Sequence, residues 1–400
     1  MRSTLRERSR PRASIIAAFA FHATVSGSLG PRLPAIKAQA GLSDAELGSA
    51  LVGFAAGLFV GTRLASWPIR RFGSRATLRV GIPLFAASLI GPALAHDLAS
   101  LTLALVLMSL AGGLLDVAMN ANAVVVERSA GRPILSGIHG VWSAGLLVAS
   151  VVAAGSAALG MSPLRQFGIV AAVLAPLSVP LLRGLIGDRE DPPTQAVPGA
   201  RRKVPWGIVL PLGAVGFCSF LGEGAVHDWS AVYLRERLGA SQAVAALGFT
   251  GFALGMTVSR VLADRWSTRF GPVALVRAGG LVAAVALACG LLVPEPAVAI
   301  AGFTVLGAGL APVVPTVFSA AGNLGHGSGA TALGWVVTIS YLGGILGPGV
   351  IGVVSGSVGL RAALFLPVGL ATVIVTLAGR AGTAQRGNQR SPEPEPPGSL

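Results

Sequence analysis

Twelve long apolar segments constrain the fold of this 400-residue chain more than any other feature of its sequence. A helix needs about 20 mostly apolar residues to cross the hydrocarbon core of a bilayer, and a helix satisfies its backbone hydrogen bonds within that one segment. We therefore predict an all-α membrane protein with twelve transmembrane helices, at residues 13–36, 45–67, 76–95, 99–125, 135–159, 164–183, 206–226, 242–263, 272–293, 296–320, 330–355 and 359–379.

The composition agrees with a membrane protein and excludes several other classes. Only 12% of the residues are charged and 53% are apolar, whereas soluble domains carry about 25% charged residues. The basic residues occur in short clusters between apolar segments, a pattern that is typical of the loops that set the orientation of a membrane protein. We therefore expect no nucleic-acid partner. The sequence contains neither a phosphate-binding loop nor a zinc motif, and its two cysteines lie in apolar segments. We therefore expect no metal site, no cofactor and no enzymatic activity.

Basic residues predict the orientation of the chain in the membrane. With the N-terminus inside, 22 of the 30 lysines and arginines lie in inside segments and six lie outside. Because basic residues concentrate on the cytoplasmic side, both termini are predicted to be cytoplasmic. For a bacterial protein this means a multi-pass protein of the inner membrane.

A polar, proline-containing segment at 184–205 divides the twelve spans into six and six. We expect it to be a cytoplasmic linker between an N-terminal bundle at 13–183 and a C-terminal bundle at 206–380. Residues 1–12 are expected to form a cytoplasmic segment. Residues 381–400 are expected to form a disordered cytoplasmic tail because of their composition.

The two halves are related by an internal repeat. When the chain is shifted by 198 residues, the second and third spans align with the eighth and ninth, with 12 identities in 30 positions. Arg71-Phe72-Gly73 aligns with Arg269-Phe270-Gly271 in this comparison. Two parallel copies of a six-helix unit are typical of secondary transporters.

The aligned segments resemble the signature of the major facilitator superfamily between its second and third helices. That resemblance implies two six-helix bundles and a charged cytoplasmic gate, at Arg71, Gly73, Arg260, Asp264, Arg265, Arg269 and Gly271. Arg260 and Asp264 are four residues apart and can pair on one helix face. In the first half Ser66 replaces the expected acid, so we expect Asp264 to matter more than Ser66. The alternative is that these arginines only set the topology.

Four further segments resemble a bacterial branch of the superfamily near the fucose permeases. They are residues 33–51, 114–145, 221–234 and 340–352. In the fucose permeases a carboxylate followed by Asn in the fourth helix couples transport to protons, and Asp116 with Asn120 matches that pattern. An acid at mid-bilayer costs about 2.5–3.5 kcal/mol on insertion scales and is favoured in its protonated form there. The alternative is a structural acid bonded by neighbouring hydroxyls and amides.

Other polar residues inside the spans are candidates for the solute cavity or for coupling. Ser219, Glu223 and His227 share one face of the seventh span, and Glu223 is a second candidate for proton coupling. A solvated outer cap of Glu223, His227 and Asp228 is the alternative, and we expect Trp229 at the membrane interface. The predicted cavity residues are His22, Ser26, Asn120, His139, Trp142, Ser143, His227 and Tyr341.

Two local patterns predict details of helix geometry. Ser43 followed by Glu46 is a capping box, which begins a helix and is not a functional site. Pro312 and Pro315 should distort the tenth span, because proline removes a backbone hydrogen bond from a helix.

These features favour a secondary transporter that moves a small polar or amphipathic solute by alternating access, with proton coupling. A metabolite or drug exporter is the alternative within the class. A non-transporting membrane sensor is the alternative from another class, and a membrane-embedded enzyme is disfavoured because no catalytic constellation appears. The expected partners are a small-molecule substrate, protons and the lipid bilayer, and we expect a monomer.

Overall fold

A computed structural model describes residues 2–130, 134–187, 205–322, 324 and 329–388. Within this part of the chain, twelve helical segments are long and apolar enough to cross a membrane. The twelve predicted spans are therefore confirmed. The expected linker at 184–205 lies mostly outside the described residues, as do residues 389–400 of the expected tail.

The first six spans form one bundle. Their elements are α1 (Arg2–Leu29), η1 (Gly30–Arg32), α2 (Leu33–Gln39), α3 (Asp44–Leu64), α4 (Ser66–Phe72), α5 (Ser74–Ser88), α6 (Ile90–Leu94), α7 (Leu98–Ala130), α8 (Leu135–Ala158), α9 (Pro163–Leu181) and η2 (Leu182–Gly184). The helix α1 begins well before the span expected from residue 13.

The last six spans form the second bundle. Their elements are α10 (Trp206–Glu236), α11 (Gln242–Phe270), α12 (Pro272–Leu292), α13 (Pro296–Leu310), α14 (Val313–Gly322), α15 (Gly329–Val358), α16 (Leu360–Ala363) and α17 (Phe365–Asn388). The tenth span is broken into α13 and α14 before Val313, so the predicted distortion by Pro312 is confirmed. The helix α17 continues past residue 381, where the tail was expected to begin.

Serine residues form the N-caps of several helices. Ser43 accepts a hydrogen bond from the backbone N–H of Glu46, and the Glu46 side chain bonds back to Ser43, which confirms the predicted capping box. Ser241 caps α11 in the same way through the N–H of Val244. Each cap satisfies a backbone donor that the first turn of a helix leaves free.

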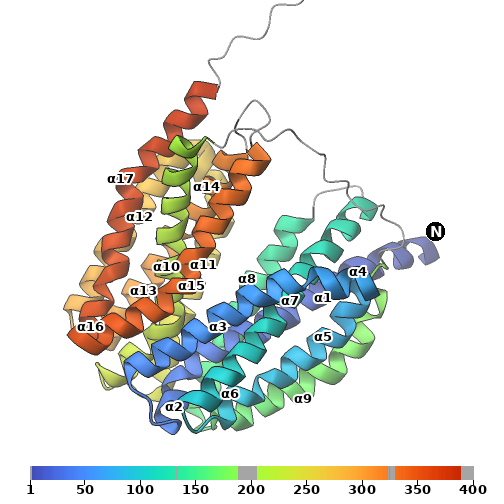
Figure 1. Cartoon of the computed structure of the whole chain (residues 1–400), viewed down its shortest axis with the longest axis horizontal. Coiled ribbons are helices and arrows are strands. Elements are labelled where there is room, and N and C mark those ends of the chain that lie inside the picture. The colour runs from blue at the N-terminus through green and yellow to red at the C-terminus, as the bar shows by residue number, and fades with distance from the viewer. Residues whose placement is uncertain (1, 131–133, 188–204, 323, 325–328, 389–400) are drawn as a thin grey trace, which may run out of the picture.

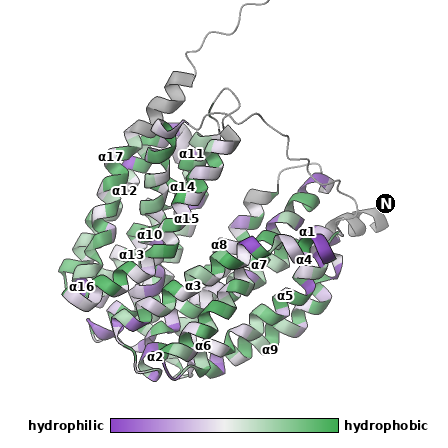
Figure 2. Ribbon diagram, viewed as in Figure 1, coloured by the Kyte–Doolittle hydropathy of each residue, from purple (hydrophilic) through white to green (hydrophobic). Residues whose placement is uncertain are grey.

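The two bundles lie side by side and approach each other closely at one end (Figure 1). We call the end that holds α2 and the start of α3 the closed end. The ribbons of the bundles diverge toward the opposite end, where the N-terminus lies, and we call this the open end. Apolar residues cover much of both bundles along the length of the helices (Figure 2), as a lipid environment requires.

The internal repeat is visible in local geometry. Gly73 ends α4 with φ 86° and ψ 157°, and Gly271 ends α11 with φ 81° and ψ 150°. Both angles lie in a region that side chains rarely adopt, so glycine is required at each position. In both copies the arginine two residues before the glycine lies over the ring of the Phe that follows it. The distance from the guanidinium carbon to the ring centroid is 5.7 Å for Arg71 and Phe72 and 5.3 Å for Arg269 and Phe270. The repeat is therefore structural as well as sequential.

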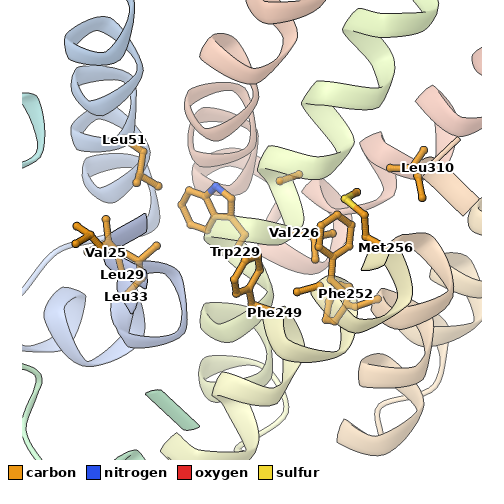
Figure 3. Close-up of a cluster of buried hydrophobic side chains, with 14 of the residues drawn as sticks. Val25, Leu29, Leu33, Leu51, Val226, Trp229, Phe249, Phe252, Met256 and Leu310 are labelled. Carbon is orange, nitrogen blue, oxygen red and sulfur yellow. The ribbon is translucent and has the colours of Figure 1, made fainter. Parts of the chain in front are cut away.

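A cluster of buried apolar side chains joins the bundles near the closed end (Figure 3). Leu29, Leu33 and Leu51 come from the first bundle, and Trp229 and Phe249 from the second. Trp229 has no exposed surface, and its indole N–H donates to the carbonyl of Pro348 at 3.2 Å. The prediction that Trp229 lies at the membrane interface is therefore wrong. This tryptophan faces the other bundle and finds its hydrogen-bond acceptor inside the protein.

Candidate functional site

Asp116 lies on α7, within a membrane-spanning segment of the first bundle, and interacts with the second bundle. Its side chain is half-buried. The Asn120 amide donates to the backbone carbonyl of Asp116 at 2.8 Å and lies 3.4 Å from its carboxylate Oδ1. The charge of Asp116 also interacts with Tyr341 of α15, which belongs to the other bundle. The structure therefore places Asp116, Asn120 and Tyr341 around one region between the bundles.

Glu223 and Arg260 are charged residues of the second bundle near Tyr341, since Glu223 follows the Tyr341 contact Phe220 by one turn of α10 and interacts with Arg260. The Ser219 hydroxyl donates to Glu223 Oε1 at 3.1 Å, one turn away on α10. Arg260 of α11 interacts electrostatically with Glu223. Its Nη1 donates to the Ser143 hydroxyl of α8 at 3.0 Å, which is a hydrogen bond between the bundles. The resemblance assigns Arg260 to a cytoplasmic gate; in the structure its guanidinium bonds to the other bundle, and the gate role stays a prediction.

Tyr341 retains much accessible surface in this region. Its side chain is 51% exposed although it lies near Asp116 of the other bundle. Its ring contacts Phe220 edge-on, with ring centroids 5.2 Å apart. No described residue hydrogen-bonds its hydroxyl group, so that group is available to a ligand.

His22 is held in packing between α1, α7 and α8 and presents little exposed surface. The indole N–H of Trp142 donates to His22 Nδ1 at 3.2 Å, and His22 Nε2 lies 3.2 Å from the carbonyl of Gly112. Because Nδ1 accepts, the proton of the neutral ring must be on Nε2, which donates to Gly112. The ring also stacks on Phe85. This arrangement fixes His22 as a neutral link between three helices.

The remaining predicted cavity residues of the first bundle are only partly brought together. His139 is exposed, and its ring lies edge-on to Phe19 with centroids 5.3 Å apart. Trp142 is half-buried and its indole is committed to His22. Ser26 is half-buried. Of this group, His139 retains the most surface for contact with a solute.

His227 and Asp228 lie closer to the closed end. His227 Nδ1 and Asp228 Oδ1 are 2.6 Å apart, and the side chains are 29% and 12% exposed. The His227 ring packs edge-on against Phe249. A Cβ added to Gly30 of the first bundle would lie 2.7 Å from the His227 carbonyl, so this turn of α10 touches the other bundle. The pair is mostly buried, which does not fit a solvated outer cap.

The other predicted gate residues lie at the open end. Arg71, Arg265 and Arg269 are exposed, and Gly73 and Gly271 end their helices beside them. Asp264 lies on α11, but its side chain is outside the described part of the structure. The predicted pairing of Arg260 with Asp264 therefore stays a prediction.

A group of charged residues at the closed end, which we call the closed-end network, was missed at the sequence level. Lys37 donates to both carboxylate oxygens of Glu236, at 2.8 and 2.6 Å, and also contacts Asp44. Asp44 Oδ2 lies 3.2 Å from Arg237 and accepts from Ser355 at 2.7 Å. Lys37 and Asp44 belong to the first bundle and the others to the second, so the network crosses the interface. The sequence signal was opposite charges in the equivalent loops of the repeat.

Replacing Lys37 with Met should weaken the closed end. The side chains of Lys37 and Asp44 are only 6% and 10% exposed. Removing one partner of a buried ion pair typically costs about 3–5 kcal/mol of stability. The Glu236 side chain is 31% exposed and can be solvated, so we expect a loss of about 3 kcal/mol or less. The melting temperature of the purified protein should fall.

The matched control is Arg235→Met in the last turn of α10. Among the described residues, Arg235 bonds only to the carbonyl of Ala240, five residues later. It should leave the melting temperature nearly unchanged. Equal melting temperatures for Lys37→Met and Arg235→Met would contradict a stabilising role for the network.

Comparisons with known proteins identify the family. An uncharacterized MFS-type transporter of Yersinia pestis is 31% identical over 353 residues, which cover 88% of this chain and 91% of that protein. The chain belongs to the major facilitator superfamily. The profile of that superfamily also matches residues 212–398. The protein is thus a multi-pass transporter that is embedded in a lipid bilayer and has a small molecule as its substrate.

Solved structures agree on the fold of this superfamily member. The nucleoside transporter NupG superposes with a TM-score of 0.70 at 14% identity, covering 93% of this chain and 98% of that one. A D-xylose-proton symporter gives a TM-score of 0.70 at 17% identity, covering 93% and 96%. At these identities the likeness concerns the fold alone. The narrower likeness to the fucose permeases stays a prediction.

Proposed function

We propose that this superfamily member is a proton-coupled symporter that moves a small polar or amphipathic solute by alternating access. The observation that carries the proposal is the placement of the embedded acids. Asp116 of the first bundle interacts with Tyr341 of the second, and Glu223 lies one turn after Phe220, whose ring contacts Tyr341. Glu223 also interacts with Arg260, which bonds to Ser143 of the first bundle. Ionisable groups inside a membrane are costly, and they usually mark substrate or proton pathways.

The closed end supports alternating access. The described direct contacts between the bundles lie mostly at that end, in the closed-end network and in the apolar cluster of Figure 3. Rocking of one bundle against the other about a central site would open this end and close the opposite one. In this proposal the structure is the state whose site communicates with the open end.

We also propose that the protein acts as a monomer in the bacterial inner membrane, with the open end and both termini in the cytoplasm. The excess of basic residues on that side supports this orientation. The segment 184–205 would then be a cytoplasmic linker between the bundles, and the chain after residue 388 would extend into the cytoplasm.

A reporter fused after residue 382 tests the orientation. A reporter that is active only in the cytoplasm should be active there, and a reporter that is active only in the periplasm should be silent. Fusions at Gly160, between α8 and α9, should give the opposite pattern, because that turn lies on the other side. Periplasmic activity of the fusion after residue 382 would overturn the proposed orientation.

A ligand screen followed by transport tests the function. Purified protein is screened against sugars, organic acids, amines and nucleosides by thermal shift, and each ligand found is tested in vesicles. The proposal expects accumulation of the ligand when an inward proton gradient is imposed, and none when the gradient is collapsed. Ligand movement that is downhill only, at the same rate with and without the gradient, would contradict proton coupling.

A further inference from the structure

Arg260 is a permanent positive charge within a membrane-spanning segment, and it forms no ion pair with the side chains that the structure describes. A guanidinium has five N–H donors and prefers planar, two-bonded contact with a carboxylate or phosphate. Among the side chains that the structure describes, the polar partner of Arg260 is the Ser143 hydroxyl, at 3.0 Å. No described carboxylate lies within ion-pair distance of it. Among the described residues only its Nη1 has a hydrogen-bond partner, and the side chain of Asp264, one turn later on α11, lies outside that set.

Glu223 is the described acid that interacts with Arg260, and it forms no ion pair with it. Glu223 feels the charge of Arg260, yet its described hydrogen bond is to Ser219 on its own helix. It compensates the guanidinium from a distance and does not bind it. When Glu223 is neutral, none of the described acids balances the charge of the guanidinium, and an anion bound there would do so.

The neighbouring groups suit the rest of a small polar molecule. Tyr341 presents an unbonded hydroxyl and a half-exposed ring from α15. Asn120 and Asp116 lie on the opposite bundle. Arg260 is the cation that the structure places in this region. The other arginines discussed above lie elsewhere: at the open end (Arg71, Arg265 and Arg269) or near the closed end (Arg235 and Arg237). One cation fits a single negative charge better than the double charge of a phosphate ester.

We propose that Arg260 binds the carboxylate of the solute, and that the solute is a small organic monoanion with hydrogen-bonding groups. The inference rests on the proposed transport function and names its substrate class. The Arg260–Ser143 bond also crosses the bundles, so a carboxylate at Arg260 would lie where the two bundles move relative to each other.

The proposal also gives Glu223 a part in coupling. An ionised Glu223 repels a second carboxylate at Arg260, whereas a protonated Glu223 does not, so the solute and one proton favour each other's binding. The other groups that face this region are Asp116 of α7 with His22 of α1 behind it, and Tyr341 of α15. Asp264 follows Arg260 on α11. Affinity for the anion should therefore rise as the pH falls.

The test uses matched pairs of solutes that differ in charge. Lactate is compared with lactamide, glycerate with glycerol, and gluconate with glucitol, by thermal shift and then by titration of the purified full-length protein. The carboxylate of at least one pair should bind, and its neutral partner should bind at least tenfold more weakly. Arg260→Gln should weaken the anion at least tenfold, and Arg260→Lys should weaken it less.

Two further variants separate the roles. Arg63→Gln is the matched control, because Arg63 lies in the equivalent helix α3, is exposed and stacks on Phe59. It should leave the affinity unchanged. Glu223→Gln should keep the affinity for the anion and remove its rise at low pH. If Arg260→Gln does not fold, the Arg260→Lys and Glu223→Gln titrations carry the test.

The possible outcomes distinguish this inference from the transport proposal. If a neutral solute binds and is accumulated with protons, and Arg260→Gln leaves its affinity unchanged, the anion inference is overturned and the transporter remains. Equal affinity for both members of a binding pair also overturns it. If a carboxylate binds through Arg260 but is not moved across vesicles, the binding site stands and the transport function fails.

Discussion

Replacing Asp116 with Asn is expected to abolish pH-driven accumulation of the solute while solute exchange survives. Asn keeps the size of the side chain and mimics a permanently protonated acid. The contacts of Asn120 should persist, because its 2.8 Å bond is to the backbone carbonyl of residue 116. Binding and exchange then require no proton movement, whereas uphill transport does.

The measurement compares counterflow with pH-driven uptake in vesicles that contain either protein. Counterflow by Asp116→Asn should remain within about threefold of the parent, and uphill uptake should fall to the level of empty vesicles. Because the embedded acid itself is costly, the variant should melt at or above the temperature of the parent. Asp97→Asn, at an exposed acid between α6 and α7, is the control and should change neither rate.

The contrary result is equally informative. Uptake at the parent's rate by Asp116→Asn would make Asp116 a structural acid that Asn120 supports. Glu223 would then be the remaining embedded candidate for proton coupling. Since Glu223 also lies near Arg260, this outcome would move coupling and solute recognition into the same bundle.

The fold could be predicted because each transmembrane span is recognisable from its own stretch of sequence. An apolar segment of the thickness of a bilayer has few alternatives to a helix, and the repeat assigns the helices to two equivalent halves. The embedded acids Asp116 and Glu223 stood out for the same reason, since a charge in such a segment needs a role. Pro312 and the Ser43 capping box also act within a few residues, and both predictions are confirmed.

What could not be predicted depends on contacts between the bundles. The Ser143 hydroxyl that bonds Arg260 lies 117 positions away in sequence, and Lys37 lies 199 positions from Glu236. Trp229 lies near the end of an apolar segment, as aromatic residues at a membrane interface do, but it is buried against the opposite bundle. Nothing in the sequence marks the pair of Arg260 and Ser143, and the Lys37–Glu236 pair is marked only by opposite charges in equivalent segments of the repeat. The contacts also belong to one state of a moving interface, so helix patterns do not encode them.

Gly48→Leu is expected to force the closed end apart. Gly48 of α3 faces Gly352 of α15 in the other bundle, and a Cβ at Gly48 would lie 2.6 Å from the Gly352 Cα. Side-chain atoms do not approach a backbone atom this closely, so the helices must separate. Overpacking typically costs about 1–3 kcal/mol, and a backbone neighbour cannot rotate away. The state closed at this end should become roughly 5- to 150-fold less populated relative to the opposite state.

A disulfide across the same helices measures this separation. A Cβ at Gly356 would lie 3.5 Å from the Cβ of Ala45, within the range that disulfides require, about 3.5–4.5 Å. Ala45→Cys and Gly356→Cys are combined with Cys218→Ala and Cys289→Ser, which remove the native thiols. The pair should cross-link rapidly in the parent background. With Gly48→Leu the rate should fall at least about fivefold.

Gly168→Leu is the matched control, because nothing lies within 4 Å of a Cβ at this position on α9. Gly168→Leu should leave the cross-linking rate and solute exchange unchanged. Gly48→Leu should slow exchange, because each transport cycle must pass through the state that is closed at this end. Unchanged cross-linking and exchange with Gly48→Leu would mean that the bundles do not meet through these glycines. Slow exchange with rapid cross-linking would instead place the defect at the central site. The two measurements together therefore decide whether the contact of α3 with α15 is a moving seal, which the alternating-access proposal requires.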